Sequence, residues 1–78
     1  MNNTARLKIT LRAARVNAGH TQRSAAMELG VTQDVVGNWE RFRSYPDAAV
    51  IPRIEEVYGV KYEDIIFLPK NNAKSVIL

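Results

Sequence analysis

The sequence of 78 residues contains no cysteine and a single histidine, His20. The absence of thiols excludes a disulfide framework and a thiolate metal site, and one imidazole cannot form a metal cluster by itself. The sequence also lacks a glycine-rich phosphate loop, and its neighbouring acidic residues are adjacent in sequence, so they would face different directions on a helix. We therefore expect no catalytic residue, no metal, no cofactor and no small-molecule substrate.

Long apolar runs are absent as well. No stretch approaches the roughly 20 apolar residues of a transmembrane helix, and residues 1–9 have no apolar run of signal-peptide length. We therefore expect a cytoplasmic protein that does not bind a membrane. The chain is long enough for one small core but too short for a second domain or a deep catalytic cleft, which favours a compact binding module.

Positive charge is concentrated in the first part of the chain. The net charge is +3, but residues 1–45 contain seven Lys or Arg and three Asp or Glu, whereas residues 46–78 contain four and five. The first part therefore has a net charge of +4 and the second of −1. A polyanion such as DNA would be attracted to the first part; ordinary scatter of surface charge is the alternative.

Two short amphipathic stretches lie on either side of Gly30. Thr21 is a suitable N-cap for a helix over residues 22–29, and Gly30 can take the positive φ that ends it. Thr32 is a suitable N-cap for a helix over residues 33–41, with Val36 and Trp39 on its inner side. The outward side would carry Gln33, Asp34, Gly37 and Asn38. This spacing predicts a helix-turn-helix whose second helix enters a DNA major groove.

Three further helices are predicted around this pair. Apolar residues at intervals of three and four predict a helix over residues 4–18 that Gly19 ends. A helix over residues 48–58 must hold Pro52 in its first turns or be kinked by it, and Gly59 ends it. Its expected core residues are Ile51, Ile54 and Val57 or Tyr58. With a short helix over residues 62–66, the prediction is an all-α domain of residues 1–69 and a tail of residues 70–78.

A longer run of matched spacings extends over about residues 11–66. It consists of Arg15, Gly19, Thr21-Gln22, Ala26, Leu29-Gly30-Val31-Thr32, Val36, Trp39-Glu40-Arg41, Pro46 and Gly59-Val60. On these residues the sequence resembles the helix-turn-helix family of phage lambda-type repressors and Cro proteins, also called the XRE family. The resemblance implies a compact five-helix domain that binds operator half-sites in double-stranded DNA, usually as a symmetric dimer, and regulates transcription.

The resemblance also implies roles for individual residues. Gln33, Asp34 and Asn38 match the base-reading positions of the recognition helix. Gln22 matches a position that contacts a phosphate or braces that helix. The remaining matches are Arg41 and Arg43, in the loop that grips the DNA backbone, and Arg15 and Glu40, which form an internal salt bridge.

The chemistry of the outward residues fits such a role. The amides of Gln33 and Asn38 carry both donors and acceptors, so either can bind adenine N6 and N7, with about 1–3 kcal/mol of base discrimination; a solvated polar face is the alternative. Asp34 would accept from cytosine N4, or would only stabilise the helix N-terminus. Val35 would contact a thymine methyl or be partly buried. Gly37 would allow close approach, or would only weaken the helix by about 1 kcal/mol.

Phosphate contacts require donors and positive charge, which the sequence supplies at both ends of the recognition helix. The candidates are Gln22, Thr32, Arg41, Arg43 and Ser44. Four departures from the family pattern are present. Ala14 and Ala25 replace larger apolar residues, so we expect a lean core unless neighbouring residues fill the space. Phe42 replaces a glycine, so we expect a longer helix or a different turn; Glu55 would need a partner if buried, and Lys61 is a poor helix cap.

Two functions follow. The first is a sequence-specific transcriptional regulator of phage or prophage repressor or Cro type, which binds an operator as a homodimer. The alternative is a protein-interaction module, such as an antitoxin or antirepressor, that retains the fold. The arginines and amides favour the first, whereas Phe42 and the apolar tail leave room for the second. Self-association is expected to use Phe67, Leu68 and Val76-Ile77-Leu78; a disordered tail is the alternative.

Overall fold

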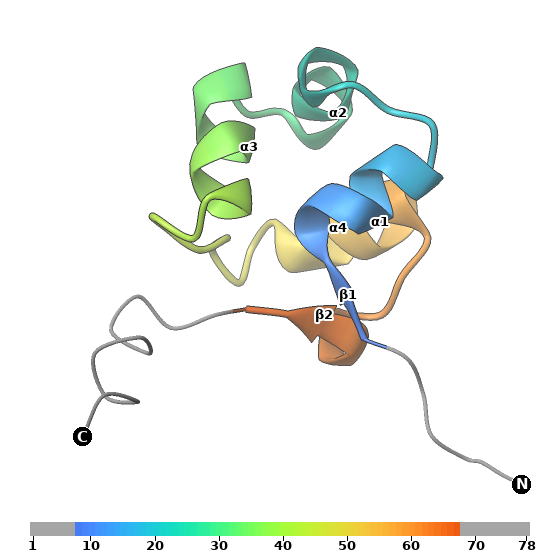
Figure 1. The fold of residues 1–78 in the computed structure, drawn as a ribbon. Helices are drawn as coiled ribbons and strands as arrows, with labels where there is room; N and C mark the ends of the chain where they lie inside the picture. Colours follow the sequence, from blue (N-terminus) through green and yellow to red (C-terminus); the bar gives the residue numbers. More distant parts are fainter. Residues whose placement is uncertain (1–7, 68–78) are drawn as a thin grey trace, which may run out of the picture.

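The structure is a computed structural model and describes residues 8–67. Its elements, in chain order, are β1 (Ile9–Thr10), α1 (Leu11–Asn17), α2 (Gln22–Leu29), α3 (Gln33–Glu40), α4 (Ile51–Tyr58), the single 3₁₀ turn η1 (Tyr62–Asp64) and β2 (Ile65–Ile66) (Figure 1). The four α-helices surround one core, and β1 and β2 lie at the end of the domain away from α2. Within residues 8–67, no helix has the length and apolarity needed to span a bilayer.

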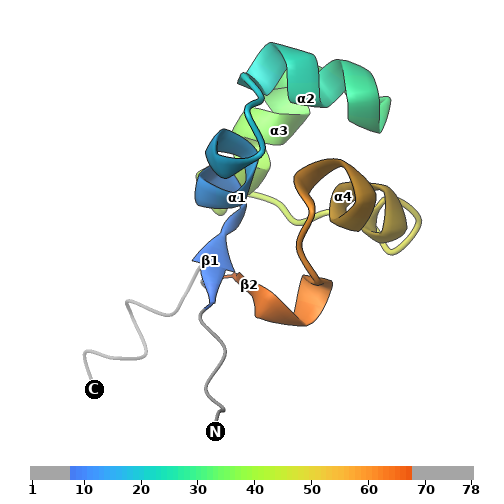
Figure 2. The ribbon, with the colours of Figure 1, turned by 90° about the vertical axis from the view of Figure 1, so that its right-hand side faces the viewer.

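The core lies where the four helices meet. Helix α2 packs against α3 and α4, and α1 packs against α3 and α4; seen from the side, α1 and α4 lie on opposite sides of the core and α2 covers its upper end (Figure 2). The small residues Ala14 on α1 and Ala25 and Ala26 on α2 are buried at these helix contacts. The buried apolar residues are Leu11, Ala14, Ala25, Ala26, Leu29, Val36, Trp39, Ile54, Tyr58 and Ile65.

Three threonines start the first three helices. Thr10, Thr21 and Thr32 have extended backbones, and each side-chain oxygen accepts a hydrogen bond from the backbone N–H three residues later. Such a bond satisfies one of the donors that a helix N-terminus leaves free. The predicted caps Thr21 and Thr32 are therefore confirmed, and the boundaries of α2 are those expected. Thr10, which the sequence analysis did not single out, fixes the start of α1.

The predicted first helix over residues 4–18 is wrong at its start. Helix α1 begins at Leu11, because Ile9–Thr10 is extended and pairs with β2 in parallel, with Ile9 opposite Ile65 and Thr10 opposite Ile66. β-Branched residues fit such a pleated pair. Residues 4–7 lie outside the described residues. A periodic apolar pattern cannot reveal this pairing, since the partner strand is more than 50 residues away in the sequence.

The predicted fifth helix over residues 62–66 is also wrong. Its first residues form only the 3₁₀ turn η1, and Ile65–Ile66 forms β2. Lys61 supplies no side-chain cap, as expected. Instead the Tyr62 backbone N–H donates to Glu55 Oε2 at 2.7 Å, which gives Glu55 the partner that its position requires. The domain is thus mostly helical with a small parallel ribbon, rather than all-α with five helices.

Helix α4 begins at Ile51, three residues later than predicted, and ends at Gly59, whose φ is 69°. Pro52 lies in the first turn, where its missing N–H has no partner to lose. Ile54 and Tyr58 are buried, as predicted, while Ile51 and Val57 are only partly buried.

Candidate nucleic-acid interface

Helices α2 and α3 are joined by a tight left-handed turn at Gly30. Gly30 has a φ of 76°, and the backbone N–H groups of Gly30 and Val31 both donate to the Ala26 carbonyl, at 2.9 and 3.0 Å. Ala25 and Ala26 are buried where the two helices meet. Glycine takes this φ without a steric cost. The turn therefore fixes the crossing of two helices in the arrangement that the sequence predicted.

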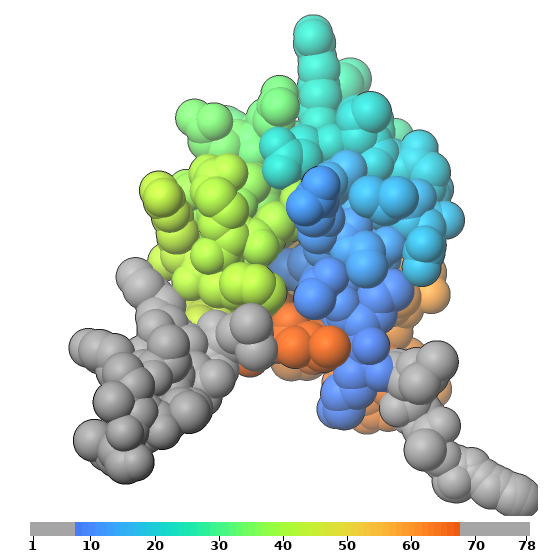
Figure 3. All heavy atoms as spheres, in the orientation of Figure 1, coloured from blue at the N-terminus to red at the C-terminus, as the bar shows by residue number. Residues whose placement is uncertain are grey.

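Helix α3 has one buried side and one polar side. Val36 is fully buried and Trp39 is 5% exposed, so the predicted inner face is confirmed. Gln33 and Asp34 are exposed and Asn38 is partly exposed. None of the three candidate base-reading residues is packed inward. The atoms of α3 and of the loop that follows it, green to yellow in Figure 3, lie on the visible face of the domain beside those of α2.

Two smaller residues of α3 differ from a simple outward face. Val35 is partly buried and packs against the core, so less of its side chain is available to contact a thymine methyl group. Gly37 was expected on the outward side, but it is buried. It is buried because the Arg41 guanidinium lies over it: a Cβ built at Gly37 would be 3.1 Å from Arg41 Nη1 and 3.4 Å from Nη2.

Arg41 is the C-cap residue of α3 and turns back along the helix. Its Nη2 donates to Asn38 Oδ1 at 3.1 Å. Arg41, Gly37 and Asn38 therefore form one cluster, in which a side chain expected to grip phosphate lies beside a residue expected to read bases. The sequence pattern alone did not indicate this cluster. The available signal was a glycine four residues before an arginine, which leaves space for a long side chain on the same helical face.

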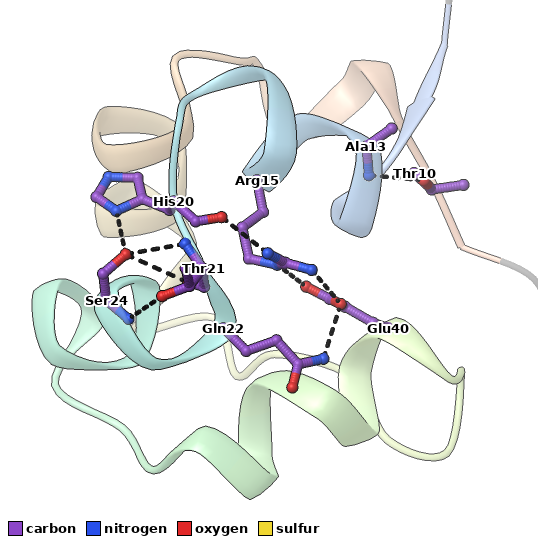
Figure 4. A network of polar contacts seen from close by, with 8 residues as sticks. All are labelled: Thr10, Ala13, Arg15, His20, Thr21, Gln22, Ser24 and Glu40. Atoms are coloured by element: carbon purple, nitrogen blue, oxygen red, sulfur yellow. Dashed lines mark hydrogen bonds and ion pairs between the residues drawn. The ribbon is translucent and has the colours of Figure 1, made fainter.

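A buried ion pair anchors the inner side of α3. Arg15 Nε donates to Glu40 Oε2 at 2.6 Å and Nη2 donates to Oε1 at 3.2 Å, with side chains only 9% and 4% exposed (Figure 4). The Arg15 Nη1 also donates to the His20 carbonyl at 2.8 Å. The hydrogen bond with Glu40 raises the pKa of Arg15, although burial acts in the opposite direction. The predicted contact between Arg15 and Glu40 is thus present, and it ties α1 to the end of α3.

Gln22 joins the same network from the first turn of α2. Its Nε2 donates to Glu40 Oε1 at 3.1 Å, so its amide braces α3 against α2. Of the two roles that the resemblance implies for Gln22, bracing is the one that this geometry performs. Nearby, Thr21 and Ser24 form a reciprocal capping box, and His20 Nδ1 lies 2.9 Å from Ser24 Oγ. His20 therefore covers the corner between α1 and α2.

Tyr58 places a hydroxyl close to this network. The residue is 4% exposed, and its hydroxyl has no hydrogen-bond partner within the described residues. Burial, together with the negative charge of Glu40, raises the pKa of Tyr58 to about 12, while the positive charge of Arg15 acts to lower it. Tyr58 therefore stays neutral in the folded protein at ordinary pH.

The turn after α3 corrects the expectation for Phe42. Neither a longer helix nor another turn forms, because Phe42 takes the left-handed conformation itself, with a φ of 61°. The Phe42 N–H donates to the Trp39 carbonyl at 3.1 Å and the Arg43 N–H donates to the Asn38 carbonyl at 2.9 Å. This is the hydrogen-bond pattern of a Schellman motif, which normally uses glycine. The turn leaves Arg43 and Ser44 exposed at the C-terminal end of α3.

The geometry defines a helix-turn-helix: two crossed helices joined at a left-handed glycine, the second anchored on one side and polar on the other. A family model described as helix-turn-helix matches residues 11–65. The chain therefore belongs to the helix-turn-helix family of lambda-repressor and Cro (XRE) type, whose members are DNA-binding regulatory domains and not normally enzymes. No curated protein and no solved structure matches the chain significantly.

Proposed function

We propose that this protein is a transcriptional regulator that binds an operator sequence through the outward side of α3. One observation carries the proposal: among the described residues, α3 is held by buried contacts on its inner side. Val36 and Trp39 bury that side, and Glu40 is fixed by Arg15 and Gln22. The polar residues of the opposite side are therefore presented by a rigid element, as base readout in a major groove requires.

In the proposed complex, Gln33, Asp34 and Asn38 face the base edges. The Gln33 amide can pair with adenine N6 and N7, and Asp34 can accept from cytosine N4. Asp34 also lies in the first turn of α3, where its charge favours the helix. Val35 and Gly37 have secondary roles at most, since one packs against the core and the other is covered.

Phosphate contacts are proposed for the two ends of α3. Thr32 lies at its N-terminus, where backbone N–H groups attract anions. Arg43 and Ser44 are exposed just beyond its C-terminus. Such contacts fix the register of the helix on the duplex without reading sequence. Gln22 acts indirectly in this arrangement, because its amide nitrogen donates to Glu40.

We further propose a phage- or prophage-type repressor that acts in the cytoplasm without catalysis, binds two half-sites as a homodimer and blocks transcription by occupying the operator. Occlusion suits so small a chain, because it requires only binding. Phe67, which contacts the rings of Tyr45 and Tyr62, is a candidate for the dimer contact. The other candidates, Leu68 and residues 76–78, and the proposed tail 70–78 lie outside the described residues.

Selection of bound sequences from a random pool of duplex DNA tests this function. The full chain should enrich a palindromic motif, and sedimentation with the selected duplex should show two protein chains per site. Arg12→Gln, a change at an exposed residue of α1 outside the proposed contacts, is the matched control and should enrich the same motif. Failure of the wild-type chain to enrich any motif would overturn the proposed function in favour of a protein partner.

A further inference from the structure

We propose that Arg41 is a specificity-determining residue: held flat over Gly37 by Asn38, its guanidinium reads a guanine in the operator. The proposal rests on the proposed function and names a base for the same site. It also changes the role of Arg41, which the family resemblance implies to be a phosphate contact.

Arg41 lies on the same side of the helix as the proposed base-reading residues. Asp34, Gly37, Asn38 and Arg41 are spaced i, i+3, i+4 and i+7, so they lie along one face of α3. This is the face opposite the buried Val36 and Trp39. The Arg41 side chain therefore starts on the same side as the proposed reading face, at its C-terminal end. Arg43, by contrast, lies beyond the left-handed turn at Phe42 and leaves the helix.

Gly37 provides the space in which the guanidinium lies. The site where a residue-37 Cβ would be is 3.1 Å from Arg41 Nη1, 3.4 Å from Nη2 and 3.6 Å from Cζ. A Cβ at this position would require the guanidinium to shift by a few tenths of an ångström. The glycine thus lets a long side chain lie flat against the helix backbone, within the width that a major groove admits. This accounts for a residue that otherwise weakens a short helix.

Asn38 fixes the direction of the guanidinium and uses one of the two lone pairs of its Oδ1 in doing so. Because Asn38 Oδ1 accepts from Arg41 Nη2 at 3.1 Å, the pair presents mainly N–H donors: those of the Asn38 amide and the remaining ones of Arg41. Guanine offers two acceptors in the major groove, N7 and O6, whereas adenine offers one acceptor and one donor. A surface of donors therefore favours guanine, rather than the adenine that a free Asn38 amide would select.

The charge of Arg41 is also available for this contact. The adjacent carboxylate, Glu40, points to the other side of α3, where both of its oxygens accept hydrogen bonds from Arg15 and Gln22. Within residues 8–67, Arg41 makes no ion pair of its own. A guanidinium whose charge is not neutralised is suited to bind the two acceptors of guanine in a bidentate contact.

The experiment separates base reading from phosphate binding by keeping the charge. Arg41→Lys retains the positive charge but loses the planar fork, so a phosphate contact would survive and a bidentate base contact would not. Arg12→Lys, at an exposed residue of α1 outside the proposed contacts, is the matched control. Wild type and both variants are carried through selection from a random duplex pool, and single-base variants of the selected site are then compared by fluorescence anisotropy.

We expect the wild-type motif to contain a guanine in each half-site. Arg41→Lys should reduce the preference for that guanine by roughly 5- to 150-fold and leave the other positions unchanged, and Arg12→Lys should leave every preference unchanged. Asn38→Ala and Gly37→Ala should weaken the same preference, since one removes the tether and the other displaces the guanidinium. An Arg41→Lys variant that selects the wild-type motif would overturn this inference alone. A wild-type chain that selects no motif would overturn the proposed function as well.

Discussion

The two sides of α3 differ in what holds their side chains. On the inner side, Val36 and Trp39 are buried in the core, and Glu40 accepts hydrogen bonds from two other helices. On the outer side, Gln33 and Asp34 face solvent. The inner side of this eight-residue helix therefore stabilises the fold, whereas its outer side contributes little to stability. Substitutions on the two sides should therefore have separable effects on stability and on DNA binding.

The largest effect is expected at the inner side, for Glu40→Ala. This change leaves the Arg15 guanidinium buried without its carboxylate, which should lower the free energy of unfolding by about 3–5 kcal/mol. Urea unfolding measures it. The double variant Arg15→Met/Glu40→Leu is the control and should recover most of the loss, because no charge remains buried. A loss below about 1 kcal/mol for Glu40→Ala would show that the pair does not anchor α3.

The second prediction concerns the outer side. Gln33→Ala should leave the free energy of unfolding within about 0.5 kcal/mol of wild type. It should nevertheless reduce base discrimination at one operator position by about 1–3 kcal/mol. Urea unfolding and binding to single-base variants of the selected operator measure the two effects. If stability and base preference changed together, the two sides of α3 would not be separable.

The third prediction compares two positions at which glycine and alanine should rank in opposite order. At Phe42, where φ is 61°, the Gly variant should be more stable than the Ala variant by about 1–2 kcal/mol, because alanine is strained in the left-handed region. At Gly37, alanine should be more stable than glycine by up to about 1 kcal/mol, since the displaced neighbour is the end of a flexible side chain. The same order at both positions would contradict the described turn.

The fourth prediction concerns the exposed end of α3. Arg43→Gln should weaken binding to all duplexes, and should reduce the slope of log binding constant against log salt concentration by about 0.9, as expected for one lost phosphate contact. Titrations at several salt concentrations measure this slope. Arg12→Gln serves again as the control. An unchanged slope for Arg43→Gln would remove Arg43 from the phosphate contacts.

The smallest effect at neutral pH is expected for Tyr58→Phe, which removes a buried hydroxyl that has no hydrogen-bond partner within the described residues. Its effect grows in alkaline solution. The pKa of Tyr58 is about 12 in the folded protein and 10 in its ordinary state. The neutral Tyr58 hydroxyl therefore favours the folded state fully below pH 10, and the stability of the wild-type protein falls as pH rises from 10 toward 12, because the unfolded chain loses this proton first. Stability of Tyr58→Phe should fall less steeply over this interval than that of wild type. The control is Tyr62→Phe, at an exposed residue; an equal slope for wild type and Tyr58→Phe would contradict the prediction.

The parts of the fold that depend on neighbouring residues could be predicted from the sequence. Thr21, Gly30 and Thr32 act within one turn of their own positions, and the inner face of α3 follows from the spacing of Val36 and Trp39. The pairing of β1 with β2 could not be predicted, because its partners are more than 50 residues apart in the sequence. The left-handed Phe42 was missed because two backbone hydrogen bonds override the preference of a single residue.

The site divides in the same way. The exposed amide of Gln33 and the contact between Arg15 and Glu40 could be inferred from position and charge. The cluster of Arg41, Asn38 and Gly37 could not be inferred in this way. It depends on the conformation of the Arg41 side chain and on the lack of a side chain at Gly37. The arginines in the sequence indicated hydrogen-bond donors near the C-terminal end of α3. Only the structure shows that one of these donors, Arg41, already donates to Asn38 Oδ1.

The parallel pairing of Ile9–Thr10 with Ile65–Ile66 also determines how this domain can be joined to something else. Both strands lie at the same edge, at the far end from α2 (Figure 1). Because the pairing is parallel, the chain enters the ribbon at Ile9, beside Ile65, and leaves it after Ile66, so attachments before β1 and after β2 would depart from opposite ends of the same edge.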